Sequence, residues 1–145
     1  MPRCRLRTVF LIVLVSAVGS WNLNEYLRSR PPSQETYSAT ELQRQLSEGR
    51  PVLLTIDAVW AMKSSARPRY MSPDVSRRIR DKGLATLTAD WTNNTPAITE
   101  LLASVKQHTV PVLVLYSPKD PKNPIVLSHN PSDSQVLGAI DAILE

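Results

Sequence analysis

The feature that most restricts the fold of this chain is a regular alternation of short apolar runs with helix-start patterns. The apolar runs are four to six residues long and carry no charge, as is typical of strands buried within a sheet. They cover residues 51–56, 84–89, 111–116 and 124–127. Helical spacing of apolar residues between them predicts helices over 38–49, 72–83, 95–105 and 132–144, and a turn or two of helix over 60–67.

Capping residues support these helix boundaries. Ser38 stands three residues before Glu41, and Ser132 stands three residues before Gln135, which is the spacing of a helix N-terminal capping box. Ser72 precedes Pro73, and proline is favoured at the first position of a helix. These predicted helices therefore begin with a residue that can satisfy their free N–H groups.

The order of these elements predicts the fold class. Strands and helices alternate and then close with two consecutive strands and a helix, which favours a mixed sheet with helices on both faces. The chain has 145 residues, a length that suits one domain. We therefore predict an α/β domain over residues 36–145, preceded by a polar linker over 21–35.

The N-terminal segment, 1–20, carries an export pattern. Arg3, Arg5 and Arg7 precede Val9–Val18, which is apolar except for one serine. A cationic start followed by an apolar run predicts a signal peptide or a membrane anchor, and both fates stay open because a spanning helix needs about 20 apolar residues. The expected location is periplasmic or at the extracytoplasmic face of a membrane.

The net charge of +4 comes largely from the three N-terminal arginines. From Trp21 onward, Lys and Arg exceed Asp and Glu by one, so we expect no nucleic-acid partner. The stretch 63–82 does carry an excess of five positive charges. Contact with an anionic lipid or an acidic partner, or a solvated helix face with local ion pairs, would each account for it.

Three segments, at residues 49–60, 89–93 and 109–116, together resemble the thioredoxin-like family, and in particular the C-terminal thioredoxin domain of DsbD-type thiol:disulfide interchange proteins. Residues 49–60 are similar to the strand that leads into a thioredoxin active site, and 89–93 resemble the stretch after the next strand. Residues 109–116 resemble the family's cis-proline strand. With the last helix, the resemblance covers about residues 36–145 and implies a thioredoxin-like fold.

The sequence departs from this family at its redox motif. Where the family carries Trp-Cys-x-x-Cys, residues 60–64 place Ala61 and Ser64 at the cysteine positions. The nearby acidic positions correspond to Thr55 and Val59, which do not titrate usefully. The single cysteine, Cys4, precedes the apolar run. Disulfide exchange needs an attacking thiolate and a resolving thiol, so we expect no thiol chemistry from this domain alone.

The candidate binding residues follow from the same resemblance. In the family, the backbone before the cis-proline pairs with an extended substrate segment, which implies a cis bond between Val110 and Pro111 and a groove beside Trp60 and Met62. Pro111 at the start of an ordinary edge strand is the alternative. Ser64 has no neighbouring base that would activate it. The sequence also shows no metal-ligand spacing, and we expect neither metal nor cofactor.

Two functions are consistent with this sequence. The first is a redox-inactive domain of the cell envelope that binds a polypeptide or a partner protein through the cis-proline groove. The second is a thiol:disulfide interchange component that acts with cysteines supplied by a partner. The absence of cysteine between residues 5 and 145 argues against an enzyme acting alone.

Overall fold

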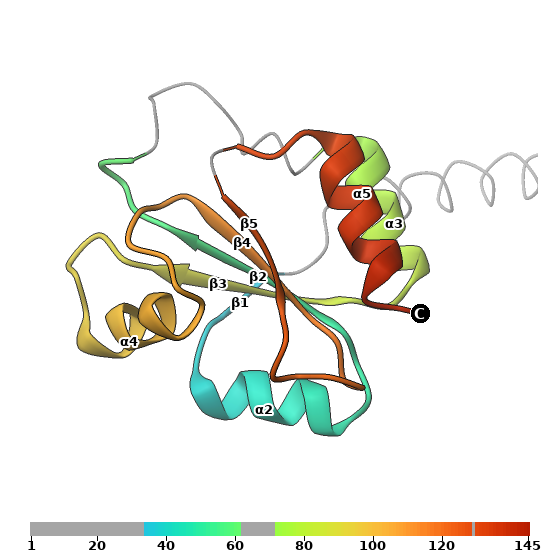
Figure 1. Ribbon diagram of the computed structural model, residues 1–145, viewed down its shortest axis with the longest axis horizontal. Helices are drawn as coiled ribbons and strands as arrows, with labels where there is room; N and C mark the ends of the chain where they lie inside the picture. Colours follow the sequence, from blue (N-terminus) through green and yellow to red (C-terminus); the bar gives the residue numbers. More distant parts are fainter. Residues whose placement is uncertain (1–33, 62–71, 129) are drawn as a thin grey trace, which may run out of the picture. The chain divides into compact units, whose positions relative to one another are not determined.

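The fold alternates strands and helices along the chain (Figure 1). The computed structural model describes residues 34–61, 72–128 and 130–145, all within one compact unit. Its elements, in chain order, are β1 (Gln34–Thr36), α2 (Ala39–Ser47), β2 (Val52–Asp57), α3 (Pro73–Asp81), β3 (Ala85–Asp90), α4 (Pro96–Ser104), β4 (Val112–Tyr116), β5 (Ile125–Ser128) and α5 (Asp133–Ala142).

The predicted strands and the four longer helices are present with boundaries shifted by a few residues at most. One strand was not predicted. Gln34 and Glu35, which were expected to belong to the linker, pair with β3 as part of β1. The folded domain therefore begins before residue 36. Beyond Ala61, the helical turns expected over 60–67 lie outside the described residues, as does the predicted N-terminal segment.

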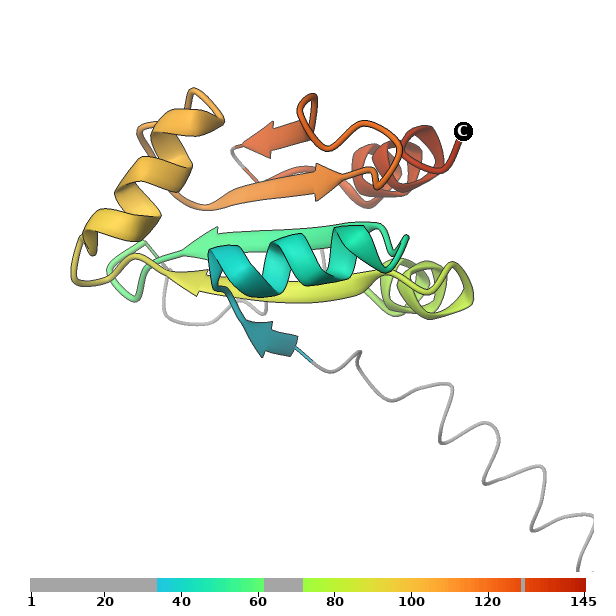
Figure 2. The ribbon, with the colours of Figure 1, turned by 90° about the horizontal axis from the view of Figure 1, so that it is seen from below.

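The sheet has the order β1-β3-β2-β4-β5 (Figure 2). β2 pairs in parallel with β3 and antiparallel with β4, and β4 pairs antiparallel with β5. The expected mixed sheet is confirmed. β2 lies at its centre and is buried along its whole length, as its continuous apolar run predicts.

Two hydrophobic clusters occupy the two faces of the sheet. Alternate residues of β2 point to opposite faces, so Leu54 belongs to one cluster and Leu53 to the other. Apolar side chains of α2 and α4 complete the first cluster, and those of α3 and α5 complete the second. Helices therefore cover both faces of the sheet, as the order of elements predicts (Figure 1).

Serine caps fix where α2, α3 and α5 start. The Ser72 and Ser132 hydroxyls accept hydrogen bonds from the backbone N–H of the third residue in their helices, and Ser132 forms a complete capping box with Gln135. Ser38 caps α2 in the same way, through the N–H of Glu41 at 3.0 Å. The Glu41 carboxylate turns to Arg44 and Gln45 instead of completing a capping box.

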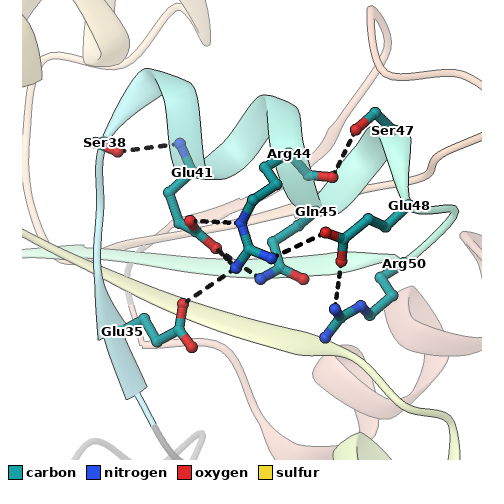
Figure 3. Close-up of polar contacts among 8 residues, drawn as sticks. All are labelled: Glu35, Ser38, Glu41, Arg44, Gln45, Ser47, Glu48 and Arg50. Atoms are coloured by element: carbon teal, nitrogen blue, oxygen red, sulfur yellow. Dashed lines mark hydrogen bonds and ion pairs between the residues drawn. The ribbon is translucent and has the colours of Figure 1, made fainter.

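A polar network runs along α2 (Figure 3). Arg44 Nη2 lies 2.5 Å from Glu41 Oε1, and Arg44 Nη1 lies 2.9 Å from Glu48 Oε1. The hydrogen bond to Arg44 lowers the pKa of Glu41 to about 2. Gln45 is 2% exposed and donates to Glu41, while its Oε1 has no hydrogen-bond partner within the described structure. A buried acceptor without a donor is uncommon and costs stability.

Candidate functional site

The candidate site lies where the parallel strands β2 and β3 end. Asp57 and Asp90 are register partners at the carboxyl ends of these strands. In the antiparallel pairing of β2 with β4, Ile56 lies opposite Val112. Val110 and Pro111, just before β4, therefore lie at the same end of the sheet as the residues that follow β2.

The segment after β2 presents two large apolar side chains to solvent. Val59 is 67% exposed and Trp60 is 60% exposed, and they are the exposed large hydrophobic residues of the described chain. The preceding Ala58 is 1% exposed, so the chain passes from the core to the surface within two residues. Val59 and Trp60 are also neighbours in sequence, so the described chain exposes its large apolar side chains at one place.

Hydrogen bonds from the end of β3 hold this segment in place. The backbone N–H of Val59 donates to Thr92 Oγ1 at 2.9 Å. Thr92 in turn donates its N–H to Asp90 Oδ1 at 2.8 Å, and its hydroxyl donates to the same oxygen. The N–H of Trp91 donates to the Asp57 carbonyl at 2.7 Å. The two strand ends are thus tied together by main-chain and side-chain contacts.

Trp60 rests against a second tryptophan. The ring centroids of Trp60 and Trp91 are 5.9 Å apart at an interplanar angle of 56°, within the range of favourable aromatic pairs. The Trp91 indole N–H donates to Thr99 Oγ1 at 3.0 Å, and that hydroxyl donates to the Thr95 carbonyl at the start of α4. α4 therefore fixes Trp91, and Trp91 supports the exposed Trp60.

The two carboxylates at the strand ends have different environments. Asp57 is 8% exposed, and its Oδ1 accepts from the N–H of Ala58 at 2.7 Å. Desolvation raises the pKa of Asp57; the Ala58 hydrogen bond opposes this rise, and the charge of Asp90 adds to it. Asp90 is exposed, and hydrogen bonds from Thr92 lower its pKa. The site thus holds one carboxylate whose neutral form is favoured by burial and one whose charged form is favoured by hydrogen bonds.

The structure places several of the predicted site residues at this end of the sheet. Ala61 follows Trp60 in a turn, and its N–H donates to the Ala58 carbonyl. Val110 and Pro111 are half-buried, and the peptide bond between them is cis. Val110 packs against the cluster on the α2 and α4 face. Met62 and Ser64 lie outside the described residues.

Three side chains that shape the site were not predicted to take part in it. Asp57, Asp90 and Thr92 fix the backbone around Val59, whereas the family's acidic positions were matched to Thr55 and Val59. Thr55 is buried and Val59 is exposed. A signal was present, because Asp57 and Asp90 each follow an apolar run, and neighbouring parallel strands bring such residues together at one edge.

The described site holds no thiol and no metal-ligand cluster. It contains apolar rings, carboxylates and hydroxyls and no thiol. Among the described residues, no group of three or more His, Cys, Asp or Glu side chains could hold a metal ion. No helix in the part of the chain that the structure covers is long and apolar enough to span a bilayer.

The basic stretch is partly neutralised where the structure describes it. Arg77 Nη1 lies 3.4 Å from Asp74 Oδ1, and Arg78 pairs with Asp141 of α5. Arg78 thereby links the two helices that cover one face of the sheet. These local ion pairs match the solvated-face alternative for α3.

Solved structures show which fold this arrangement represents. A thioredoxin from Thermus thermophilus superposes with a TM-score of 0.59 at 16% identity, over 79% of this chain and 88% of that one. The oxidised DsbD C-terminal domain of Neisseria meningitidis superposes with a TM-score of 0.57 at 16% identity, over 74% of this chain and 97% of that one. Trxlp of Edwardsiella tarda superposes with a TM-score of 0.56 at 17% identity, over 74% of this chain and 98% of that one.

The chain therefore has a thioredoxin-like fold, as the sequence resemblance implies. The sequence itself matches no family model and no curated protein. At these identities the structural likeness establishes the fold, and the function has to be argued from the site.

Proposed function

We propose that this chain is a thioredoxin-like binding domain of the cell envelope that holds an extended polypeptide or a partner protein without electron transfer. The proposed surface consists of Val59, Trp60 and the cis-linked Val110–Pro111 segment. The observation that carries the proposal is the exposure of Val59 and Trp60 on a backbone fixed by Thr92 and Trp91.

A fixed apolar surface binds at a lower entropic cost than a mobile one. The hydrogen bond from the Val59 N–H restrains the backbone, and the contact with Trp91 restrains the Trp60 ring, so less conformational freedom is lost on binding. Tryptophan is also among the residue types that most often dominate binding energy at protein interfaces. The half-buried Val110 adds a main-chain segment at the same end of the sheet, beside which an extended partner segment can lie.

The proposed location follows from the N-terminal pattern of arginines and apolar residues, which is that of an exported or membrane-tethered protein. The site's chemistry supports binding over catalysis. The only cysteine of the sequence is Cys4, and disulfide exchange requires a thiolate together with a second, resolving thiol.

The contribution of Trp60 follows from its exposure. A tryptophan buries about 150–250 Å² when fully covered. With 60% of Trp60 exposed, about 90–150 Å² is free for a partner, which is worth about 2–4 kcal/mol. Trp60→Ala should therefore raise the Kd for the partner about 30- to 700-fold.

The test is partner capture from intact cells with a photoreactive amino acid in place of Val59 in the full chain. We expect a discrete crosslinked product that disappears with Trp60→Ala and with Val110→Asp. Gln43→Ala, at an exposed position of α2, is the matched control and should leave the product unchanged. Thermal unfolding of each variant establishes that it is folded. A product that survives both site substitutions would contradict the proposal.

The thioredoxin-like fold and the likeness to the DsbD domain, for which oxidised and reduced structures are known, support a second candidate. In it, the chain assists thiol:disulfide interchange with cysteines supplied by its partner. It predicts that the captured partner carries a reactive cysteine pair and that its reduction rate falls when Trp60→Ala replaces the native chain. A partner without such cysteines would exclude this candidate and leave the first intact.

A further inference from the structure

The two carboxylates of the candidate site adjoin its exposed apolar residues. Asp57 and Asp90 are register partners at the carboxyl ends of β2 and β3, which run side by side to the same edge of the sheet (Figure 2). Asp90 is exposed, and its Oδ1 accepts a hydrogen bond from the Thr92 hydroxyl, which itself accepts the N–H of Val59. A carboxylate therefore lies two hydrogen bonds away from the backbone that carries the exposed Val59 and Trp60 side chains.

No ion pair among the described residues involves either carboxylate. Hydrogen bonds from Thr92 account for the lowered pKa of Asp90. Lys106 and His108 are exposed on the loop that leads to β4, and neither is paired with Asp57 or Asp90 within the described part of the chain. Asp57 is 8% exposed, and a buried carboxylate without a cation is costly. A cation that a partner brings to this place would offset that cost.

Trp60 provides a surface suited to the same cation. Tryptophan is the aromatic side chain that binds a lysine or arginine cation over its ring most favourably. Trp60 is 60% exposed, so most of its surface is free to meet a partner even though Trp91 lies against it. Lysine and arginine also have long apolar stems, which cover apolar surface while the charged end reaches a carboxylate. Such a side chain can contact both Trp60 and a carboxylate at the strand ends.

We propose that the polypeptide segment bound at this surface carries a lysine or arginine next to an apolar residue. The cation lies over the Trp60 ring within reach of Asp90, and the apolar residue packs on Val59. This inference rests on the proposed function and names the class of polypeptide that the surface selects. Charge complementarity favours this occupant over the others. An acidic segment would bring like charges to Asp90, and a purely apolar one would cover the carboxylates without pairing them.

Peptide selection with the purified full chain tests this preference. Short random peptides are selected for binding at low ionic strength, where charge contacts are least screened. Lysine and arginine should be enriched next to apolar residues among the selected peptides, relative to the starting library. The net charge of the chain is +4, so non-specific electrostatic attraction would enrich acidic peptides instead. Enrichment of basic residues therefore reports a local site.

Matched peptides measure the contribution of the cation without altering the protein. One selected peptide is resynthesised with glutamine, and separately with glutamate, in place of its basic residue. The Kd should rise about 3- to 30-fold for the glutamine peptide, from the loss of an exposed ion pair and of the contact with the Trp60 ring. The glutamate peptide should bind more weakly still, because it brings a like charge to Asp90.

Asp90→Asn tests whether this carboxylate pairs with the cation. Asparagine keeps an oxygen that accepts from Thr92 and removes the charge. The ratio of the Kd of the glutamine peptide to that of the basic peptide should fall about 1.5- to 5-fold in this variant. Asp81→Asn is the matched control and should leave the ratio unchanged. Asp81 is exposed at the end of α3, next to the start of β3, whereas Asp90 lies at the end of that strand.

The outcomes separate this inference from the function on which it rests. Binders that depend on Trp60 but show no preference for basic residues, or a Kd ratio that Asp90→Asn leaves unchanged, would overturn the inference and leave the proposed function intact. A selection in which no binder is lost with Trp60→Ala would contradict the proposed function itself. Thermal unfolding of each variant establishes that it is folded.

Discussion

Replacing Asp57 with asparagine should change how the stability of the domain depends on pH. The asparagine side chain keeps an oxygen that can accept the Ala58 N–H, now 2.7 Å from Asp57 Oδ1, and removes the buried charge beside Asp90. The substitution therefore tests the electrostatic character of the site with little change in shape.

The direction of the Asp57 pKa shift determines whether stability rises or falls with pH. Burial raises the pKa of Asp57 in the folded state above its ordinary value of 3.8. Between pH 3.8 and this raised pKa, the folded state therefore binds more protons than the unfolded state. The contribution of Asp57 to stability is therefore fully present below pH 3.8 and is lost as the pH rises through the folded-state value. Since one proton is involved, the slope is at most about 1.4 kcal/mol per pH unit.

Urea unfolding of the wild type and Asp57→Asn between pH 3 and pH 8 measures this contribution. The unfolding free energy of the variant should rise relative to that of the wild type as the pH increases above 3.8, by no more than about 1.4 kcal/mol per pH unit. Asp90→Asn is the control, for which the pH-dependent change in unfolding free energy should have the opposite sign. Hydrogen bonds from Thr92 lower the pKa of Asp90. The unfolding free energy of Asp90→Asn should therefore fall relative to that of the wild type as the pH rises. Parallel stability curves for Asp57→Asn and the wild type would refute the reasoning.

Three further substitutions test the packing and capping. Leu54→Ala removes a fully buried side chain from the central strand and should cost about 2–5 kcal/mol of unfolding free energy, measured by urea unfolding. Gln45→Met removes the unpartnered acceptor along with one hydrogen bond to Glu41, and should stay within about 1 kcal/mol of the wild type in the same assay. Ser132→Ala breaks the α5 capping box and should cost about 1 kcal/mol, seen as a lower Tm, whereas Gln43→Ala at an exposed position of α2 should leave the Tm unchanged.

The main elements were predictable because their signals are local. The continuous apolar run of β2 and the serine caps of α3 and α5 depend on neighbours in sequence, and the structure has both. β1 was missed because three exposed polar residues carry no strand pattern. Gln34–Thr36 form a strand only because β3 offers them a parallel partner about 50 residues later in the chain.

The candidate site was predictable only in part for a similar reason. Trp60 and Val110 were singled out by resemblance, but the support under them is a tertiary arrangement. The hydrogen bond from Val59 to Thr92 spans 33 residues, and the contact between Trp60 and Trp91 joins the ends of two strands. Such contacts follow from the strand register, which a single sequence does not specify.

The pairing of Trp60 with Trp91 has a spectroscopic consequence. Two of the three tryptophans in the sequence lie at the candidate binding surface, one of them largely open to water. Indole emission shifts to shorter wavelength when water is excluded, and two indoles at this separation couple in the near-ultraviolet circular dichroism spectrum. Occupation of the surface should therefore change both signals without an added dye, and Trp91→Phe would assign the coupled band to this pair.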